Sequence, residues 1–111
     1  MSITTHVLDT ARGRPAAGLA VTLSHRGGNG AWSAVGTGLT DDDGRVADLT
    51  SGRVEAGDYR LDFATAAYFK SAGAKAFYPE VSVVFTVDDP GAHHHVPLLL
   101  SPFGYSTYRG T

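Results

Sequence analysis

Hydrophobic and polar residues alternate along most of the chain with a period of two, and turn signals interrupt this alternation at intervals of about ten residues. The alternation is cleanest where Tyr59, Leu61 and Phe63 share one side of an extended segment. The pattern predicts strands at residues 3–8, 19–25, 32–40, 45–49, 59–63, 81–87, 93–100 and 105–108. Residues 65–76 are rich in alanine and do not alternate, which predicts one short helix. Because crossover helices are missing, we expect an all-β fold, a two-sheet antiparallel β-sandwich of about eight strands.

Length and composition limit the number of domains and the classes of partner. The 111 residues leave no room for two cores of ordinary size, so we expect a single domain spanning residues 1–111. Nine scattered lysines and arginines against eleven acidic residues give a net charge of −2. This charge distribution excludes the basic surface that nucleic-acid binding requires. The absence of cysteine excludes disulfides and thiolate chemistry.

The N-terminal residues contain neither a basic segment nor an apolar run, so the sequence predicts no secretory signal. The longest apolar run, residues 96–100, is too short to cross a bilayer. We therefore expect a cytoplasmic protein that does not bind membranes.

Histidines are concentrated in the strand predicted near the C-terminus. With a period of two, His93 and His95 lie on one face of this strand and His94 on the other. The face of His94 also carries valine and leucine, so we expect it to point into the core and to leave His95 on the outer face. In the first predicted strand, Thr4 and His6 lie opposite the face that carries isoleucine and valine. Both strands therefore present a histidine away from the core.

These histidines allow more than one kind of chemistry, and most histidines in proteins have only a structural role. His93 and His95 could hold zinc with His6 as a third ligand, because alternate residues of a strand place their Cα atoms about 6–7 Å apart. No acidic residue that would orient such ligands is evident. The segment 41–44 starts like a calcium loop but lacks the remaining ligand positions, so it predicts a solvated turn. Motifs for a nucleophilic serine or a phosphate-binding loop are absent.

Four segments carry motifs that strand alternation does not explain. They are His-Val-Leu-Asp-Thr at residues 6–10, Asp-Gly-Arg at residues 43–45, Phe-Tyr-Pro-Glu-Val at residues 77–81, and the run at residues 93–110. The last contains His-Val-Pro-Leu-Leu and ends in Tyr-Ser-Thr-Tyr-Arg-Gly. Together these segments resemble the transthyretin-related hydrolase family, and the resemblance covers the whole chain. It implies a transthyretin-like sandwich.

The resemblance implies an enzyme of urate degradation that hydrolyses a ring amide of 5-hydroxyisourate, a small purine-derived molecule. It implies that His6, Arg45 and His95 form the catalytic set, without a metal or cofactor. The residues that complete the substrate pocket would be Tyr108, Arg109, Gly110 and Thr111. The family also implies a homotetramer, a dimer of dimers with its active sites at the dimer–dimer interface.

Two positions depart from the family pattern. His94 stands where tyrosine is usual, and because it faces the predicted core we expect a change in packing rather than in catalysis. Thr111 stands where serine is usual and keeps the hydroxyl group. Alanine at His93 or His94 is expected to preserve most of the activity.

Two alternative functions remain open for the sequence. One is a small-ligand carrier in the manner of transthyretin, although a carrier has no need of the three catalytic residues together. The other is a zinc hydrolase with histidine ligands. A carrier would bind a flat ligand without consuming it, and a zinc enzyme would lose activity on chelation.

Overall fold

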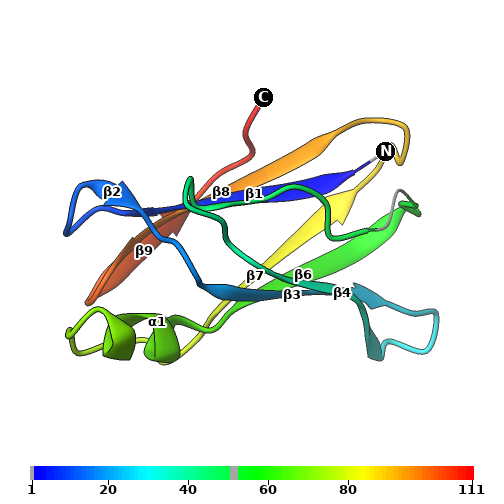
Figure 1. Cartoon of the computed structure of the whole chain (residues 1–111). Coiled ribbons are helices and arrows are strands. Elements are labelled where there is room, and N and C mark those ends of the chain that lie inside the picture. Colours follow the sequence, from blue (N-terminus) through cyan, green and yellow to red (C-terminus); the bar gives the residue numbers. More distant parts are fainter. Residues whose placement is uncertain (1, 51–52) are drawn as a thin grey trace.

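The computed structural model describes residues 2–50 and 53–111, which form two β-sheets packed face to face with one short helix at one end (Figure 1). The first sheet contains β1 (Ile3–Asp9), β2 (Arg14–Pro15), β5 (Arg45–Val46), β8 (His94–Ser101) and β9 (Gly104–Thr107). The second sheet contains β3 (Ala20–Arg26), β4 (Trp32–Leu39), β6 (Gly57–Phe63) and β7 (Val81–Val87). The predicted two-sheet sandwich is confirmed, and the structure adds a two-residue strand, β2, that the alternation did not predict.

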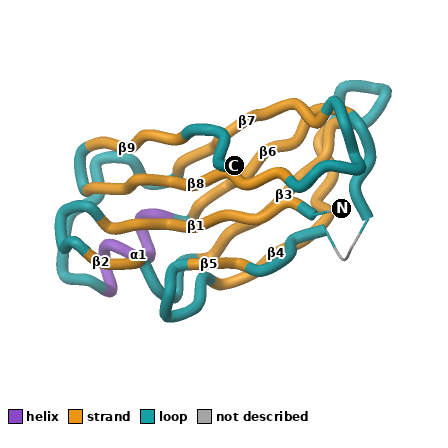
Figure 2. Tube along the Cα trace, turned by 90° about the horizontal axis from the view of Figure 1, so that it is seen from above, coloured by secondary structure: helices purple, strands orange, loops and turns teal. Residues whose placement is uncertain are grey.

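The order of strands in the first sheet is β2-β1-β8-β9, with β5 also paired to β1, and the second sheet has the order β4-β3-β6-β7. Figure 2 shows the first sheet from above. Strands β1 and β8 are parallel, with Ile3 opposite His94 and Asp9 opposite Leu100. All other pairs between the strands named above are antiparallel, as predicted. Strands joined by a short hairpin must be antiparallel, whereas β1 and β8 are separated by most of the chain and are free of that constraint.

The core between the sheets is built from alternate residues of β1, β3, β6 and β8. Tyr59, Leu61 and Phe63 are buried in it, as their alternation predicted. His94 is 4% exposed and donates from Nδ1 to the carbonyl oxygen of Ala92 at 3.1 Å, which confirms that its face points inward. The largest side chains that are fully buried are Phe63, Phe69, Ile3, Leu19, Leu23, Leu61, Leu98 and Leu100.

Two elements are shorter than the sequence predicted. The helix α1 (Thr65–Ser71) ends well before residue 76, because Gly73 adopts a positive φ of 74° that stops helical hydrogen bonding. Strand β5 ends at Val46 instead of residue 49. No helix in the described part of the chain is long and apolar enough to span a membrane.

Candidate active site

The outer face of the first sheet brings together the three residues proposed as catalytic. His6 is the direct partner of Arg45 across the β1–β5 pair. His95 is the partner of Thr4 across the β1–β8 pair, and Thr4 lies on the same face as His6. Both β1 and β8 turn isoleucine, valine and leucine toward the core, so their polar residues converge on the outer face. The structure therefore places two imidazoles and one guanidinium on neighbouring strands.

A tight turn holds Arg45 in position. The carboxylate of Asp41 accepts hydrogen bonds from the backbone N–H groups of Asp43 at 2.9 Å and of Arg45 at 3.0 Å. Gly44 has a φ of 77°, and its carbonyl oxygen accepts a 2.7 Å hydrogen bond from the backbone N–H of Val7. A Cβ atom at Gly44 would collide with the carbonyl oxygen of Val7, so only glycine fits this approach to β1. The exposed turn confirms the prediction of a solvated turn.

An open cleft of about 510 Å³ lies on the same face. Its volume is in the range of small-molecule sites. His6 is not among the residues that line it, but it adjoins Arg45 across the β1–β5 pair. The lining residues are Thr4, Thr5, Arg45, Val46, Ala47, His93, His95 and Thr111. The cleft is therefore polar at the histidines and Arg45 and apolar at Val46 and Ala47.

Burial lowers the pKa of His95 below its ordinary value, and the neighbouring positive charges of Arg45, His93 and His6 lower it further. The imidazole is therefore neutral near neutral pH, the state in which it can accept a proton. Its Nδ1 atom lies 2.8 Å from the Thr4 hydroxyl oxygen, which fixes the ring orientation. Within the described part of the chain, no hydrogen bond occupies Nε2, so this nitrogen is free to face a water or substrate.

The C-terminal segment completes one side of the cleft. After β9 it continues along β8 and then rises from the outer face of the first sheet (Figure 1). The backbone N–H of Gly110 donates to the carbonyl oxygen of His95 at 2.8 Å. A Cβ atom at Gly110 would lie 2.6 Å from Cδ2 of His95, so the absence of a side chain lets the segment touch the imidazole. Thr111 then lines the cleft.

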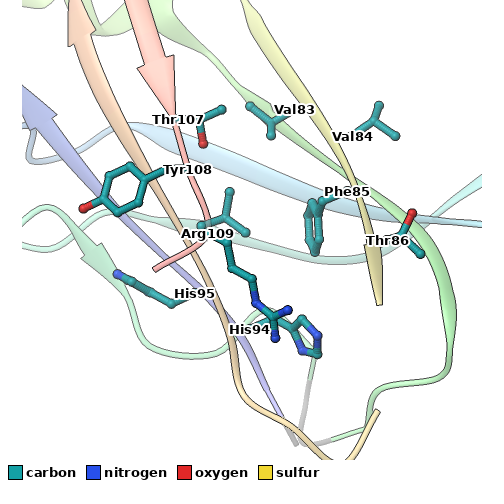
Figure 3. Close-up of a pocket in the computed structure, with 10 residues that line it drawn as sticks. Val83, Val84, Phe85, Thr86, His94, His95, Thr107, Tyr108 and Arg109 are labelled. Carbon is teal, nitrogen blue, oxygen red and sulfur yellow. The ribbon is translucent and has the colours of Figure 1, made fainter. Parts of the chain in front are cut away.

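Tyr108 and Arg109 line a different and smaller pocket of about 190 Å³ (Figure 3). This pocket lies at the edge of the sandwich between β7 and β8, and its walls are formed by residues 83–86, 94–96 and 107–109. In Figure 3 the side chain of Arg109 extends toward His94. Within one chain, the proposed substrate-binding residues are therefore divided: Thr111 lines the cleft that contains both His95 and Arg45, whereas Tyr108 and Arg109 share a pocket with His95 but not with Arg45.

The zinc alternative has no geometric support. In residues 2–50 and 53–111, no group of three or more histidine, cysteine or carboxylate side chains is arranged to hold a metal ion. His93 and His95 have nearly parallel rings with centroids 6.3 Å apart, and a threonine hydroxyl lies between them instead of a shared ligand position.

Sequence reasoning assigned no function to Thr4 and left His93 outside the catalytic set. In the structure both line the cleft, and Thr4 contacts His95 directly. The period of two had already placed Thr4 on the face of His6. The alternation did not predict which residue of the neighbouring strand pairs with Thr4.

Comparison with known proteins decides the family. The family described as HIUase/transthyretin matches residues 3–110. The chain belongs to this family. It is 46% identical over 110 residues to the 5-hydroxyisourate hydrolase of Salmonella dublin, covering 98% of this chain and 80% of that protein.

Solved structures of both a hydrolase and a carrier share the fold. The 5-hydroxyisourate hydrolase of Klebsiella pneumoniae superposes with a TM-score of 0.88 at 34% identity and covers 100% of both chains. Sea bream transthyretin, solved in complex with thyroxine, superposes with a TM-score of 0.93 at 34% identity and covers 100% of this chain and 96% of its own. Since the fold fits both, the side chains on the outer face must distinguish the two functions.

Proposed function

We propose that the chain is a hydrolase that opens a ring amide of 5-hydroxyisourate and yields 2-oxo-4-hydroxy-4-carboxy-5-ureidoimidazoline. The observation that carries this proposal is the meeting of His95 and Arg45 in one open cleft, with His6 adjoining Arg45. The lowered pKa of His95 favours the neutral ring that a base needs. A carrier needs no such group of ionisable side chains. Identity of 46% with a hydrolase over nearly the whole chain supports the same conclusion.

In the proposed mechanism, His95 acts as the general base. Its Nε2 atom accepts a proton from a water molecule, and the resulting hydroxide attacks the ring carbonyl. Arg45 stabilises the negative charge that develops on the carbonyl oxygen, a role that suits its permanent charge and planar donors. His6, next to Arg45, orients the water or the substrate ring. The Thr111 hydroxyl would hold the substrate from the C-terminal side of the cleft.

An ultraviolet assay of freshly generated 5-hydroxyisourate tests the function. We expect the purified protein to speed the loss of the substrate absorbance far above the spontaneous rate, and a chelator to leave that rate unchanged. Binding of the substrate without consumption would instead indicate a carrier. Loss of turnover on chelation, with recovery on adding zinc, would indicate a metal enzyme.

We also propose that the protein is a homotetramer, a dimer of dimers, in which a second subunit covers the open side of each cleft. The single chain leaves the histidines and Arg45 on an open outer face, which a covering subunit would shield from bulk water. The pocket between β7 and β8, which contains Tyr108 and Arg109, would be closed by another copy. A mass measurement of the native assembly tests this. The cytoplasmic location stays a prediction.

The contact between Gly110 and the His95 ring predicts a large effect of one methyl group. Gly110→Ala would place a carbon 2.6 Å from Cδ2 of His95, so either the ring or the C-terminal segment must move. We expect turnover to fall about tenfold to a hundredfold, because a misplacement of about 1 Å has this order of effect. Gly28→Ala is a matched control, since a Cβ atom there meets nothing within 4 Å. Equal activity of the two variants would contradict the contact.

The environment of His95 predicts the acidic limb of the pH profile. Burial and nearby positive charge favour the neutral ring, so the pKa of His95 in the folded protein lies below the ordinary 6.5. The acidic limb of the activity is therefore expected to have its midpoint below pH 6.5, because activity falls as pH drops through the lowered pKa. Measurement of kcat/KM against pH, together with NMR titration of the same ring, checks this. An acidic limb above pH 6.5 would exclude His95 as the base.

A further inference from the structure

Four side chains form a continuous hydrogen-bonded row that ends at His95. The Ser2 hydroxyl oxygen lies 2.7 Å from Nδ1 of His93, and Nε2 of His93 lies 3.1 Å from the Thr4 hydroxyl oxygen. The same Thr4 oxygen lies 2.8 Å from Nδ1 of His95. We name these residues, Ser2, His93, Thr4 and His95, the histidine–hydroxyl chain. It leads from the half-buried ring of His95 to the exposed ring of His93 and the end of β1.

The parallel pairing of β1 and β8 creates this row. It sets Thr4 opposite His95, and the backbone N–H of His94 donates to the carbonyl oxygen of Ser2 at 3.0 Å. On each strand the residues that face outward are two positions apart. Those of one strand therefore alternate with those of the other along a single row. The imidazole rings are inclined by only 15°, which lets one hydroxyl contact both.

The number of protons that each group can donate restricts how the histidine–hydroxyl chain can be protonated. A hydroxyl has one proton, so Thr4 can donate to only one of the two imidazoles and must accept from the other for both contacts to be hydrogen bonds; a continuous row with one direction has Thr4 donate to one ring and accept from the other. If His95 donates from Nδ1 to Thr4, then Thr4 donates to Nε2 of His93, and His93 donates from Nδ1 to Ser2. In this direction Nε2 of His95 carries a lone pair toward the cleft. In the reverse direction Nε2 carries the proton instead.

We propose that the histidine–hydroxyl chain is a proton relay that sets the tautomer of His95 and conducts a proton from the cleft to solvent. This inference rests on the proposed function. When Nε2 of His95 takes a proton from the attacking water, Nδ1 passes its proton to Thr4, Thr4 passes its own to Nε2 of His93, and Nδ1 of His93 passes its proton to Ser2. The original hydroxyl proton of Ser2 leaves to bulk water. Each group keeps its number of protons, and only the direction of the hydrogen bonds in the histidine–hydroxyl chain reverses.

The chemistry of the site gives this relay a purpose. Without it, a proton taken by His95 would leave a positive imidazolium beside Arg45, the same charge that already disfavours protonation of this ring. The relay leaves His95 neutral with its proton on Nε2. When Nε2 gives this proton to the departing ring nitrogen, the row runs in reverse: Nδ1 of His95 takes a proton from Thr4, Thr4 takes one from Nε2 of His93, and Nδ1 of His93 takes one from Ser2. Ser2 replaces its proton from bulk water, so His95 returns to its starting tautomer. Hydrolysis of an amide also creates a carboxyl group, which ionises with a pKa of about 3–4 and so releases a proton near neutral pH. A proton must therefore leave the site in each turnover.

Replacement of the bridging hydroxyl tests the relay by activity. Thr4→Val keeps the shape of the side chain but breaks the row, and Thr4→Ser keeps the hydroxyl. We expect Thr4→Val to lower kcat about tenfold to a hundredfold with little change in KM, and Thr4→Ser to restore most of the loss. Thr22→Val, a threonine of β3 in the other sheet, is the matched control and should turn over like the unaltered protein.

Replacement of His93 supplies a readout that a purely structural role would not change. The sequence alone left His93 outside the catalytic set and predicted little effect of alanine there, but the relay predicts otherwise. We expect His93→Ala to lower kcat about tenfold in dilute buffer, because the proton has lost its path, and added imidazole to restore the rate in a saturable way. Imidazole should not restore Thr4→Val, in which the link next to His95 is missing. Normal kcat for both His93→Ala and Thr4→Val would overturn the relay.

A third measurement does not depend on turnover. Nitrogen-15 NMR of the imidazole rings in the free protein should show His95 protonated mainly at Nδ1, and Thr4→Val should shift that balance toward Nε2. An Nε2–H tautomer of His95 in the unaltered protein would overturn the relay. If the unaltered protein fails to consume 5-hydroxyisourate, the proposed function fails by itself, and the NMR result still decides whether the chain orders the tautomer of His95.

Discussion

Arg45→Ala is expected to lower kcat/KM for 5-hydroxyisourate about a hundredfold to a thousandfold while the protein stays folded. In the proposed mechanism the guanidinium stabilises the negative charge that forms when water adds to the ring carbonyl, and loss of one such donor has this order of effect. The side chain of Arg45 is exposed on the outer face and β5 is only two residues long, so its removal disturbs little of the core. Steady-state kinetics and a thermal melt measure the two effects separately.

Arg14→Ala is the control for this experiment. Arg14 is an exposed arginine of β2 in the same sheet and is not among the residues that line the cleft. The Arg14→Ala variant loses the same charge as Arg45→Ala, but not from the cleft. This variant should therefore retain nearly full activity. Turnover by Arg45→Ala at the level of Arg14→Ala would show that the guanidinium does not act on the reacting carbonyl.

His95→Ala is expected to lower turnover about a hundredfold to ten-thousandfold, since it removes the proposed general base. His95→Gln distinguishes proton transfer from hydrogen bonding, because an amide can orient a water but cannot take its proton. Both variants should therefore be impaired, and His95→Gln should recover little of the loss. Circular dichroism and melting temperature check that the sheet survives.

The control for His95 is a histidine of the other sheet. His25 lies in β3, in the sheet that does not carry the proposed chemistry, and its ring packs against Tyr59 at a tilt with ring centroids 4.6 Å apart. His25→Asn should leave kcat unchanged even if it lowers the melting temperature. If His95→Gln turned over within a few-fold of His25→Asn, the base would have to be another group, and His6 beside Arg45 would be the next candidate.

Two features of the site were predictable because their causes are local. Alternation in β1 and β8 placed His6 and His95 on the faces away from the core, and the structure confirms both. The Asp-Gly-Arg turn was predictable because glycine alone tolerates the positive φ found at Gly44. The family resemblance then selected Arg45, which no periodicity would have identified.

Other features required the assembled sandwich. The residues proposed for the substrate pocket follow one another in the chain, yet Tyr108 and Arg109 line the edge pocket whereas Thr111 lines the cleft. A segment leaving a strand can turn to either side of a sheet, and the bridge between Gly110 and His95 decides which side it takes. The lengths of β5 and α1 were likewise overestimated from composition.

The amino-acid sequence by itself determined which residues form strands, which of their faces are apolar, and which family the chain resembles. These properties depend on side-chain chemistry within a few residues. Only the tertiary structure decided that β1 lies parallel to β8 with Thr4 opposite His95, positions that are 91 residues apart. The register between such distant strands is set by the packing of both sheets at once, because a slip of one residue would turn every buried side chain of β1 outward.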